Sequence, residues 1–233
     1  MRSILAFILP LLLCGCLFGD NMSEPVIELD EDDFVVVLPF KHPDFRSRWD
    51  SPEGRDLMIG VTEILQRNAE FSVRPYQDVI DLYLSEDLDA LGPKDVAALC
   101  RADYVLVCDI IKWDPMDEQS IGITKGRAKV RARLFKHNPT TTDAQDEDEV
   151  ERLERANEAR RAAGLPLLEA SAGGQWVTDN EVTATYPDTY LDQYGDVLTT
   201  REEAEAGLLR STALKVAELF YEHQEIFKSQ TGR

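Results

Sequence analysis

Hydrophobic and polar residues form blocks along the chain that predict alternating strands and helices. Residues 34–40 and 103–111 are almost continuous apolar runs rich in β-branched side chains, which is typical of strands buried on both faces. Residues 71–75 form a shorter strand-like run that ends in proline. Because helical patterns separate these three runs, right-handed crossovers and a parallel sheet are expected.

The best-marked helix is predicted over residues 52–68. Ser51 can serve as its N-cap, and Pro52 occupies the first helical position. Apolar residues then recur at helical spacing, namely Leu57, Val61, Ile64 and Leu65. The spacing therefore predicts an amphipathic helix that packs on the sheet.

Further helices are expected around residues 79–83, from Pro93 to Cys100, and at the end of the chain. The last begins with a capping box made by Thr200 and Glu203. Its apolar face consists of Leu208, Leu209, Thr212, Val216, Leu219, Phe220, His223 and Phe227. This pattern predicts a long C-terminal helix.

Two segments have strictly alternating polar and apolar residues, at 127–135 and 181–186. This alternation predicts an antiparallel hairpin with one dry and one wet face. Between them, the insertion 137–175 is rich in charge and has a weak apolar stripe, so an exposed helix or hairpin arm is expected. The predicted fold class is α/β, with a mixed sheet of about five strands, a three-stranded parallel part plus the hairpin, and packing helices.

The amino terminus has the pattern of an export signal. A basic start precedes the apolar run 4–13. This run is shorter than the about 20 residues that a membrane-spanning helix needs. Leu13-Cys14-Gly15-Cys16 resembles the bacterial lipobox, which implies cleavage before Cys16 and acylation of its sulfur. The alternative is an ordinary cleaved signal in which Cys16 is incidental.

The lipobox resemblance suggests three parts: a signal peptide over 1–15, an acidic tether over 16–33, and one α/β domain over 34–233. Leu17 follows the acylated cysteine. In lipoproteins of this kind, that residue implies export to the outer membrane, so a periplasm-facing domain is expected. The lipid on Cys16 would then hold the protein on the membrane.

Composition narrows the range of partners. The chain has 44 acidic residues against 25 Lys and Arg, a net charge of −19. Such a charge argues against nucleic acid and against broad binding to anionic lipid.

Cys100 and Cys108 form either a disulfide or two buried thiols, and their expected places at a helix end and in mid-strand favour free thiols.

No motif for enzyme chemistry is found. A phosphate loop, a Gly-x-Ser-x-Gly elbow, a His-Glu-x-x-His pair and zinc-ligand spacing are all absent from the sequence. We therefore expect no catalytic residue, no metal and no cofactor. Asp109, an acid within an apolar strand, either pairs with Lys112 or a backbone amide, or marks an enzyme site.

Two further features suggest binding. The first is a basic row along one strand, made of Arg127, Lys129, Arg131 and Arg133. The row is either a solvated face that acids such as Glu181 balance, or a docking surface. The docked group would be an acidic partner or the insertion. The second feature is a set of three tryptophans, which the hypothesis of a ligand site would use: Trp49, Trp113 and Trp176. Trp176 lies in an expected loop over 171–176.

Three segments together resemble a known domain: 36–40 (Val-Val-Leu-Pro-Phe), 71–73 (Phe-Ser-Val) and 102–107 (Ala-Asp-Tyr-Val-Leu-Val). The domain is shared by the amino-terminal part of TolB and the CsgG-type curli-secretion lipoproteins. The resemblance covers residues 34–135 and resumes at 181. It implies a periplasmic lipoprotein domain.

This chain departs from that family in two ways. It has Cys108 and Asp109 where a small residue is usual, and the insertion is too charged for the membrane-inserted hairpins of CsgG-type pores. A non-enzymatic accessory or assembly component of an envelope complex, with protein partners, is therefore expected rather than a pore. The alternative is an envelope module that binds a small or polymeric ligand.

Overall fold

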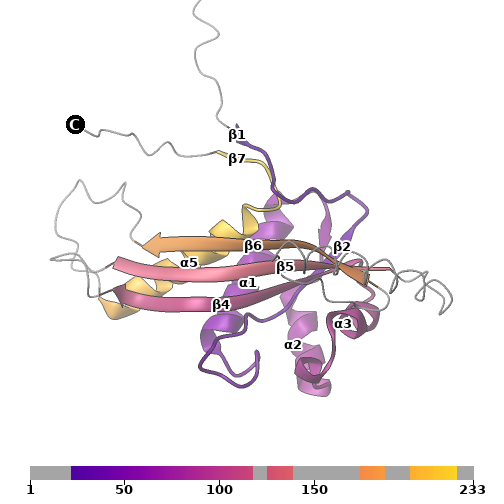
Figure 1. Ribbon diagram of the computed structural model, residues 1–233, viewed down its shortest axis with the longest axis horizontal. Coiled ribbons are helices and arrows are strands. Elements are labelled where there is room, and N and C mark those ends of the chain that lie inside the picture. The colour runs from indigo at the N-terminus through magenta and orange to yellow at the C-terminus, as the bar shows by residue number, and fades with distance from the viewer. Residues whose placement is uncertain (1–21, 118–124, 139–173, 187–199, 225–233) are drawn as a thin grey trace, which may run out of the picture.

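The computed structural model describes residues 22–117, 125–138, 174–186 and 200–224. Its main sheet has five strands in the order β3-β2-β4-β5-β6 (Figure 1). These strands are β2 (Phe34–Val37), β3 (Ser72–Val73), β4 (Tyr104–Asp117), β5 (Lys125–His137) and β6 (Gly174–Tyr186). The first three run parallel, whereas β4, β5 and β6 pair antiparallel. The predicted α/β class and mixed sheet are confirmed.

The parallel half holds the centre of the core. Val35, Val36 and Val37 of β2 are at most 1% exposed, so both faces of this strand are covered. Val36 lies opposite Val105 of β4, which is fully buried as well. Burial on both faces explains why β2 appears in the sequence as an unbroken apolar run.

Helix α1 (Pro52–Asn68) has the predicted bounds. The Ser51 hydroxyl accepts a hydrogen bond of 3.0 Å from the Gly54 amide, which satisfies one of the first free N–H groups of the helix. The Gly54 carbonyl in turn accepts a 3.0 Å bond from the Phe40 amide, so the start of α1 is fastened to the segment that follows β2.

Three helical segments connect β3 and β4: α2 (Tyr76–Ser85), the short 3₁₀ helix η2 (Leu88–Ala90) and α3 (Pro93–Cys100). Cys100 ends α3 and Cys108 lies within β4. Both cysteines are buried and unbonded, which confirms the expected free thiols. Burial raises the pKa of each thiol, so both stay protonated near neutral pH.

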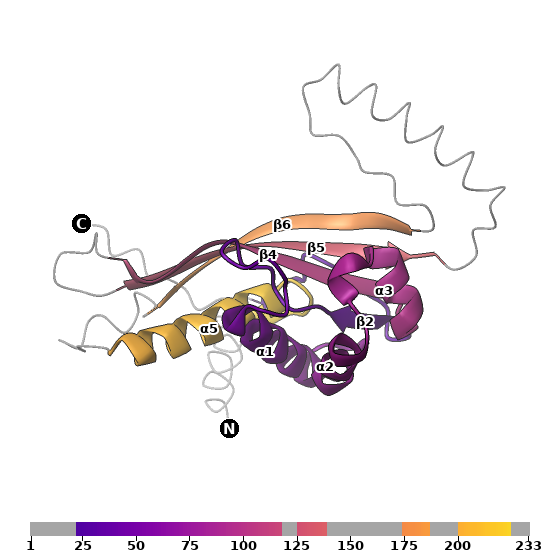
Figure 2. The same cartoon turned by 90° about the horizontal axis from the view of Figure 1, so that it is seen from below.

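Helix α5 (Arg201–Ala217) starts at the predicted capping box and covers one face of the antiparallel half. Ala128 of β5 and Ala184 of β6 pack against Leu208 of this helix. Figure 2 shows α1 and α5 together on the same side of the sheet. Within the described residues, no helix combines the length and apolar character needed to cross a bilayer.

Helix α5 is shorter than its sequence pattern predicted. It ends at Ala217, and the Leu219 carbonyl instead accepts a 2.8 Å hydrogen bond from the Ile27 amide. The chain then forms β7 (His223–Gln224), which pairs with β1 (Met22–Ser23). Leu219 and Phe220 still face the core, although the backbone is no longer helical. The apolar stripe in the sequence therefore continues beyond the end of the helix. Phe227 lies outside the described residues.

The amino-terminal segment also differs from expectation. Residues 16–33 were expected to form a solvated tether, but Ile27 is only 3% exposed and β1 is paired with β7. The segment therefore contacts the core through Ile27 and Leu29, whereas Met22 and Val26 are exposed. Cys16 and residues 139–173, most of the predicted insertion, lie outside the described residues.

Strand β6 begins seven residues earlier than the alternation at Glu181 indicated, at Gly174. Phe135 of β5 lies opposite Trp176. The hydrogen-bonded ladder between β5 and β6 therefore includes residues before Glu181, where polar and apolar side chains alternate only weakly. Trp176 is therefore a strand residue and does not belong to a loop.

Gly54 provides a test of how the segment after β2 meets α1. A Cβ at this position would lie 2.1 Å from the Phe40 carbonyl oxygen, a backbone atom that is not free to move aside. We predict that Gly54→Ala lowers the free energy of unfolding by about 1–3 kcal/mol, measured by urea denaturation.

Gly92→Ala is the matched control. The added Cβ would meet only the Asp95 side chain, at 3.6 Å. A loss below about 1 kcal/mol is expected at this N-cap position. Equal losses in the two variants would contradict the close approach at Gly54.

Candidate functional site

The sheet face opposite α5 carries the predicted basic row. Because side chains alternate along β5, Arg127, Lys129, Arg131 and Arg133 share this face, while Ala128 and Val130 point toward α5. Figure 1 looks onto the face that carries the row, with α5 behind the strands. The row therefore lies on the side of the sheet that α5 leaves uncovered.

Acids on the neighbouring strands balance much of this row. Lys129 Nζ lies 2.5 Å from a carboxylate oxygen of Glu181. Arg131 binds Asp179 with two nitrogens, and its Nε donates at 2.7 Å. Hydrogen bonding by Arg131 lowers the pKa of Asp179 below its usual range. Cross-strand pairing with acids that include Glu181 is thus present, while docking at the row stays a prediction.

Asp109 has different partners from those expected. Its Oδ1 accepts from Arg48 and its Oδ2 from Arg133, each at 2.9 Å. Lys112, the expected partner, lies 3.6 Å from Asp114 instead. The register shift between Ile110 and Lys112 leaves both Asp109 and Lys112 on the face of the row, but Arg48 and Arg133 already occupy the two carboxylate oxygens of Asp109.

Arg48 also fastens the segment after β2 to the sheet. Its Nη1 donates to the Cys108 carbonyl at 2.7 Å and to the Pro39 carbonyl at 3.3 Å. Its backbone amide donates to Asp89 of η2 at 2.9 Å. A single arginine thus joins the segment after β2, the interior of β4 and the helical connection.

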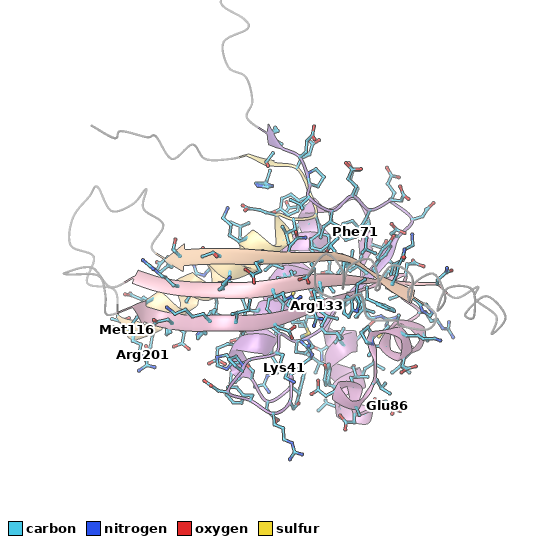
Figure 3. The ribbon with its side chains drawn as sticks, in the orientation of Figure 1. Lys41, Phe71, Glu86, Met116, Arg133 and Arg201 are labelled. Atoms are coloured by element: carbon cyan, nitrogen blue, oxygen red, sulfur yellow. The ribbon has the colours of Figure 1, made fainter. Side chains whose placement is uncertain are left out.

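A surface pocket of about 310 Å³ lies between these elements. The segment after β2 contributes Lys41, Arg46 and Arg48, and the sheet contributes Arg133 and Trp176. The third side is the η2–α3 segment, with Leu88, Asp89, Leu91, Pro93 and Val96. Figure 3 labels Lys41, from the segment after β2, and Arg133, from the middle of the sheet.

Trp176 forms an aromatic wall of this pocket. The Arg133 guanidinium lies 4.7 Å from the centroid of the Trp176 ring, and Phe135 meets the same ring edge-on at 5.5 Å. The other two tryptophans lie elsewhere: Trp49 stacks on Tyr83 at 5.2 Å, and Trp113 packs against the core. The structure does not gather the three tryptophans into one site.

Strand β6 is an edge of the main sheet. It pairs with β5 along one side over its full length. Among the described strands, none pairs with its other side. Thirteen residues of β6 therefore present one row of backbone N–H and C=O groups without a strand partner in this part of the chain.

Sequence reasoning identified some of these residues and missed others. Arg133, Asp109 and Trp176 were singled out separately, and the structure brings them together. Arg48 and Lys41 were missed, because they lie in an irregular segment with no periodic pattern. The signal available in the sequence was that several basic residues follow a buried strand at short spacing.

Comparisons with known proteins give no family. No family model matches the chain, and no curated protein matches it. The chain is similar in structure to lipoprotein GNA1162 from Neisseria meningitidis, with a TM-score of 0.41 and 14% identity over 66% of this chain and 82% of that one.

Two other solved structures are similar at the same level. PelC from Paraburkholderia phytofirmans, a dodecamer, has a TM-score of 0.41 and 13% identity over 86% of this chain and 96% of its own. The hypothetical protein CT253 from Chlamydia trachomatis has a TM-score of 0.40 and 12% identity, over 81% and 97%. Likeness this low assigns neither family nor function, and the TolB and CsgG resemblance stays a prediction.

The arginine pair around Asp109 gives a test of the site's construction. In Asp109→Asn, Arg48 and Arg133 would face each other without an anion between them. We predict that the free energy of unfolding falls by about 1–3 kcal/mol in urea denaturation.

Asp179→Asn is the control on the same sheet face. Its side chain is 46% exposed, against 28% for Asp109, so solvent screens its ion pair more strongly. A loss below about 1 kcal/mol is expected. A larger loss for Asp179→Asn than for Asp109→Asn would contradict the role given to Asp109.

Proposed function

We propose that this chain is a lipid-anchored protein of the bacterial cell envelope. On this proposal Cys16 carries the lipid, and the α/β domain faces the periplasm from the outer membrane. The domain is a non-enzymatic accessory or assembly component of an envelope complex. The lipobox-like sequence supports the anchor, and the position of β6 at the edge of the described sheet supports assembly.

The observation that carries the assembly role is the edge strand β6. A long strand with one unpaired side is a template for an added strand from another chain, and soluble proteins usually blunt such edges. β6 extends over thirteen residues. The net charge of −19 disfavours close approach of identical copies, so the partner proposed here is a different envelope protein.

The anchor proposal is tested by Cys16→Ser. Each buried methylene of an acyl chain contributes about 0.8 kcal/mol, so two or three chains hold a domain on a membrane almost permanently. The variant is predicted to fold normally but to appear in the soluble fraction after cell breakage, measured by immunoblotting of separated membranes. Retention of the variant on membranes after a high-salt wash would refute a lipid anchor.

The assembly proposal is tested by site-specific photo-crosslinking in living cells. A photoreactive residue at Thr183, exposed on β6, is predicted to give a discrete adduct with an envelope protein. The same residue at Leu84, which is 72% exposed on α2, is the control and is predicted to give none. Adducts are read by immunoblotting and mass spectrometry. No adduct at Thr183, or equal adducts at both positions, would count against assembly through β6.

A second candidate function is ligand binding at the envelope. The pocket beside Trp176 favours it, because an aromatic wall, apolar residues and several cations converge there. This candidate is compatible with the same lipid anchor, and it involves different residues from the β6 edge.

A further inference from the structure

The pocket beside Trp176 has more positive charge than its own acids balance. Its lining contains Lys41, Arg46, Arg48 and Arg133, but only one acid, Asp89. Asp109 stands behind the lining and bonds both Arg48 and Arg133. Two cations therefore remain uncompensated, in a chain whose net charge is −19.

Lys41 and Arg46 are these two cations. Within the part of the chain that the structure describes, neither side chain has an acidic partner within ion-pair distance. Both are exposed at the pocket mouth, where a ligand can reach them without displacing an internal contact. Their charges attract anions from solution, and apolar walls weaken the screening by water.

Arg133 adds a second indication. Its Nη2 bonds Asp109, but its Nε is buried and has no hydrogen-bond partner among the described residues. A buried guanidinium donor without an acceptor is unfavourable, so an anion beside Arg133 would supply what the protein itself does not.

Most of the remaining lining is apolar. Leu38, Leu88, Val96 and Val107 are at most 5% exposed and form a dry floor. The Trp176 ring provides a stacking surface at the side. The volume of about 310 Å³ is at the lower end of the range for ligand sites, which fits one ring with one charged group.

We propose that this pocket binds a small organic anion. A carboxylate or phosphate group of the ligand lies among Lys41, Arg46 and Arg133, and its flat apolar body lies against Trp176 and the floor. The proposal rests on the ligand-binding candidate and does not depend on assembly at β6.

Isothermal titration calorimetry of the purified full chain in non-ionic detergent tests this site with phenyl phosphate. Inorganic phosphate carries only the anion and benzyl alcohol only the ring, so each is predicted to bind at least about tenfold more weakly. Affinity for phenyl phosphate is predicted to fall as salt is raised. A parallel titration with benzoate distinguishes a site for carboxylates from a site for phosphates. Binding of either phenyl phosphate or benzoate supports the proposal.

Variants locate the binding. Lys41→Gln and Arg46→Gln are exposed changes outside the Asp109 network, and each is predicted to weaken binding by about three- to tenfold. Trp176→Ala is predicted to remove the advantage of phenyl phosphate over inorganic phosphate. Lys112→Gln is the control, because Lys112 is an exposed cation of the sheet outside the pocket lining. The affinity of this variant for phenyl phosphate is predicted to stay unchanged.

Three results would overturn the proposal: no binding of either phenyl phosphate or benzoate, equal weakening by Lys112→Gln, or inorganic phosphate binding as tightly as phenyl phosphate. Thermal unfolding of each variant separates loss of binding from loss of fold. Crosslinking at Thr183 in the Arg46→Gln background reports on the assembly proposal separately, so the two proposals can fail independently.

Discussion

The backbone ladder between β4 and β5 is the interaction on which the rest of this structure depends. It joins the parallel half of the sheet, where β4 pairs with β2, to the antiparallel half, where β5 pairs with β6. The register sets which side chains face α5 and which face away. Val130 and Leu134 lie under the helices, while Arg131 and Arg133 lie on the opposite face. Since a shift of one residue would exchange the two faces, the buried side chains fix the register firmly.

That register also builds the pocket. Val107 lies opposite Arg133, and Asp109 lies opposite Arg131, so Asp109 and Arg133 are diagonal neighbours on one face and can bond. Arg48 then reaches the same carboxylate from the segment after β2 and holds that segment against the sheet. The positive charges at the pocket are thus brought together by the fold, against the overall acidity of the chain.

Sequence patterns predicted much of the fold and less of the site. Residues 52–68 and the buried strands were found because a buried face imposes a strict period on apolar residues. The end of α5 was misplaced, because Leu219 and Phe220 keep the apolar stripe while the backbone turns to meet Ile27. The start of β6 was misplaced because backbone pairing with β5, rather than side-chain burial, holds residues 174–180. The partners of Asp109 come from a diagonal position on β5 and from an irregular segment, and neither contact leaves a periodic signal.

We propose that the edge of β6 without a partner among the described strands is where the domain meets a protein partner in the envelope. Hydrogen–deuterium exchange with mass spectrometry compares the protein in isolated envelopes with the same protein purified in detergent. Slower exchange is expected in envelopes for the amides of Gly174–Tyr186, with no change in Tyr76–Ser85 of α2. Equal exchange of the β6 amides in the two preparations would contradict it.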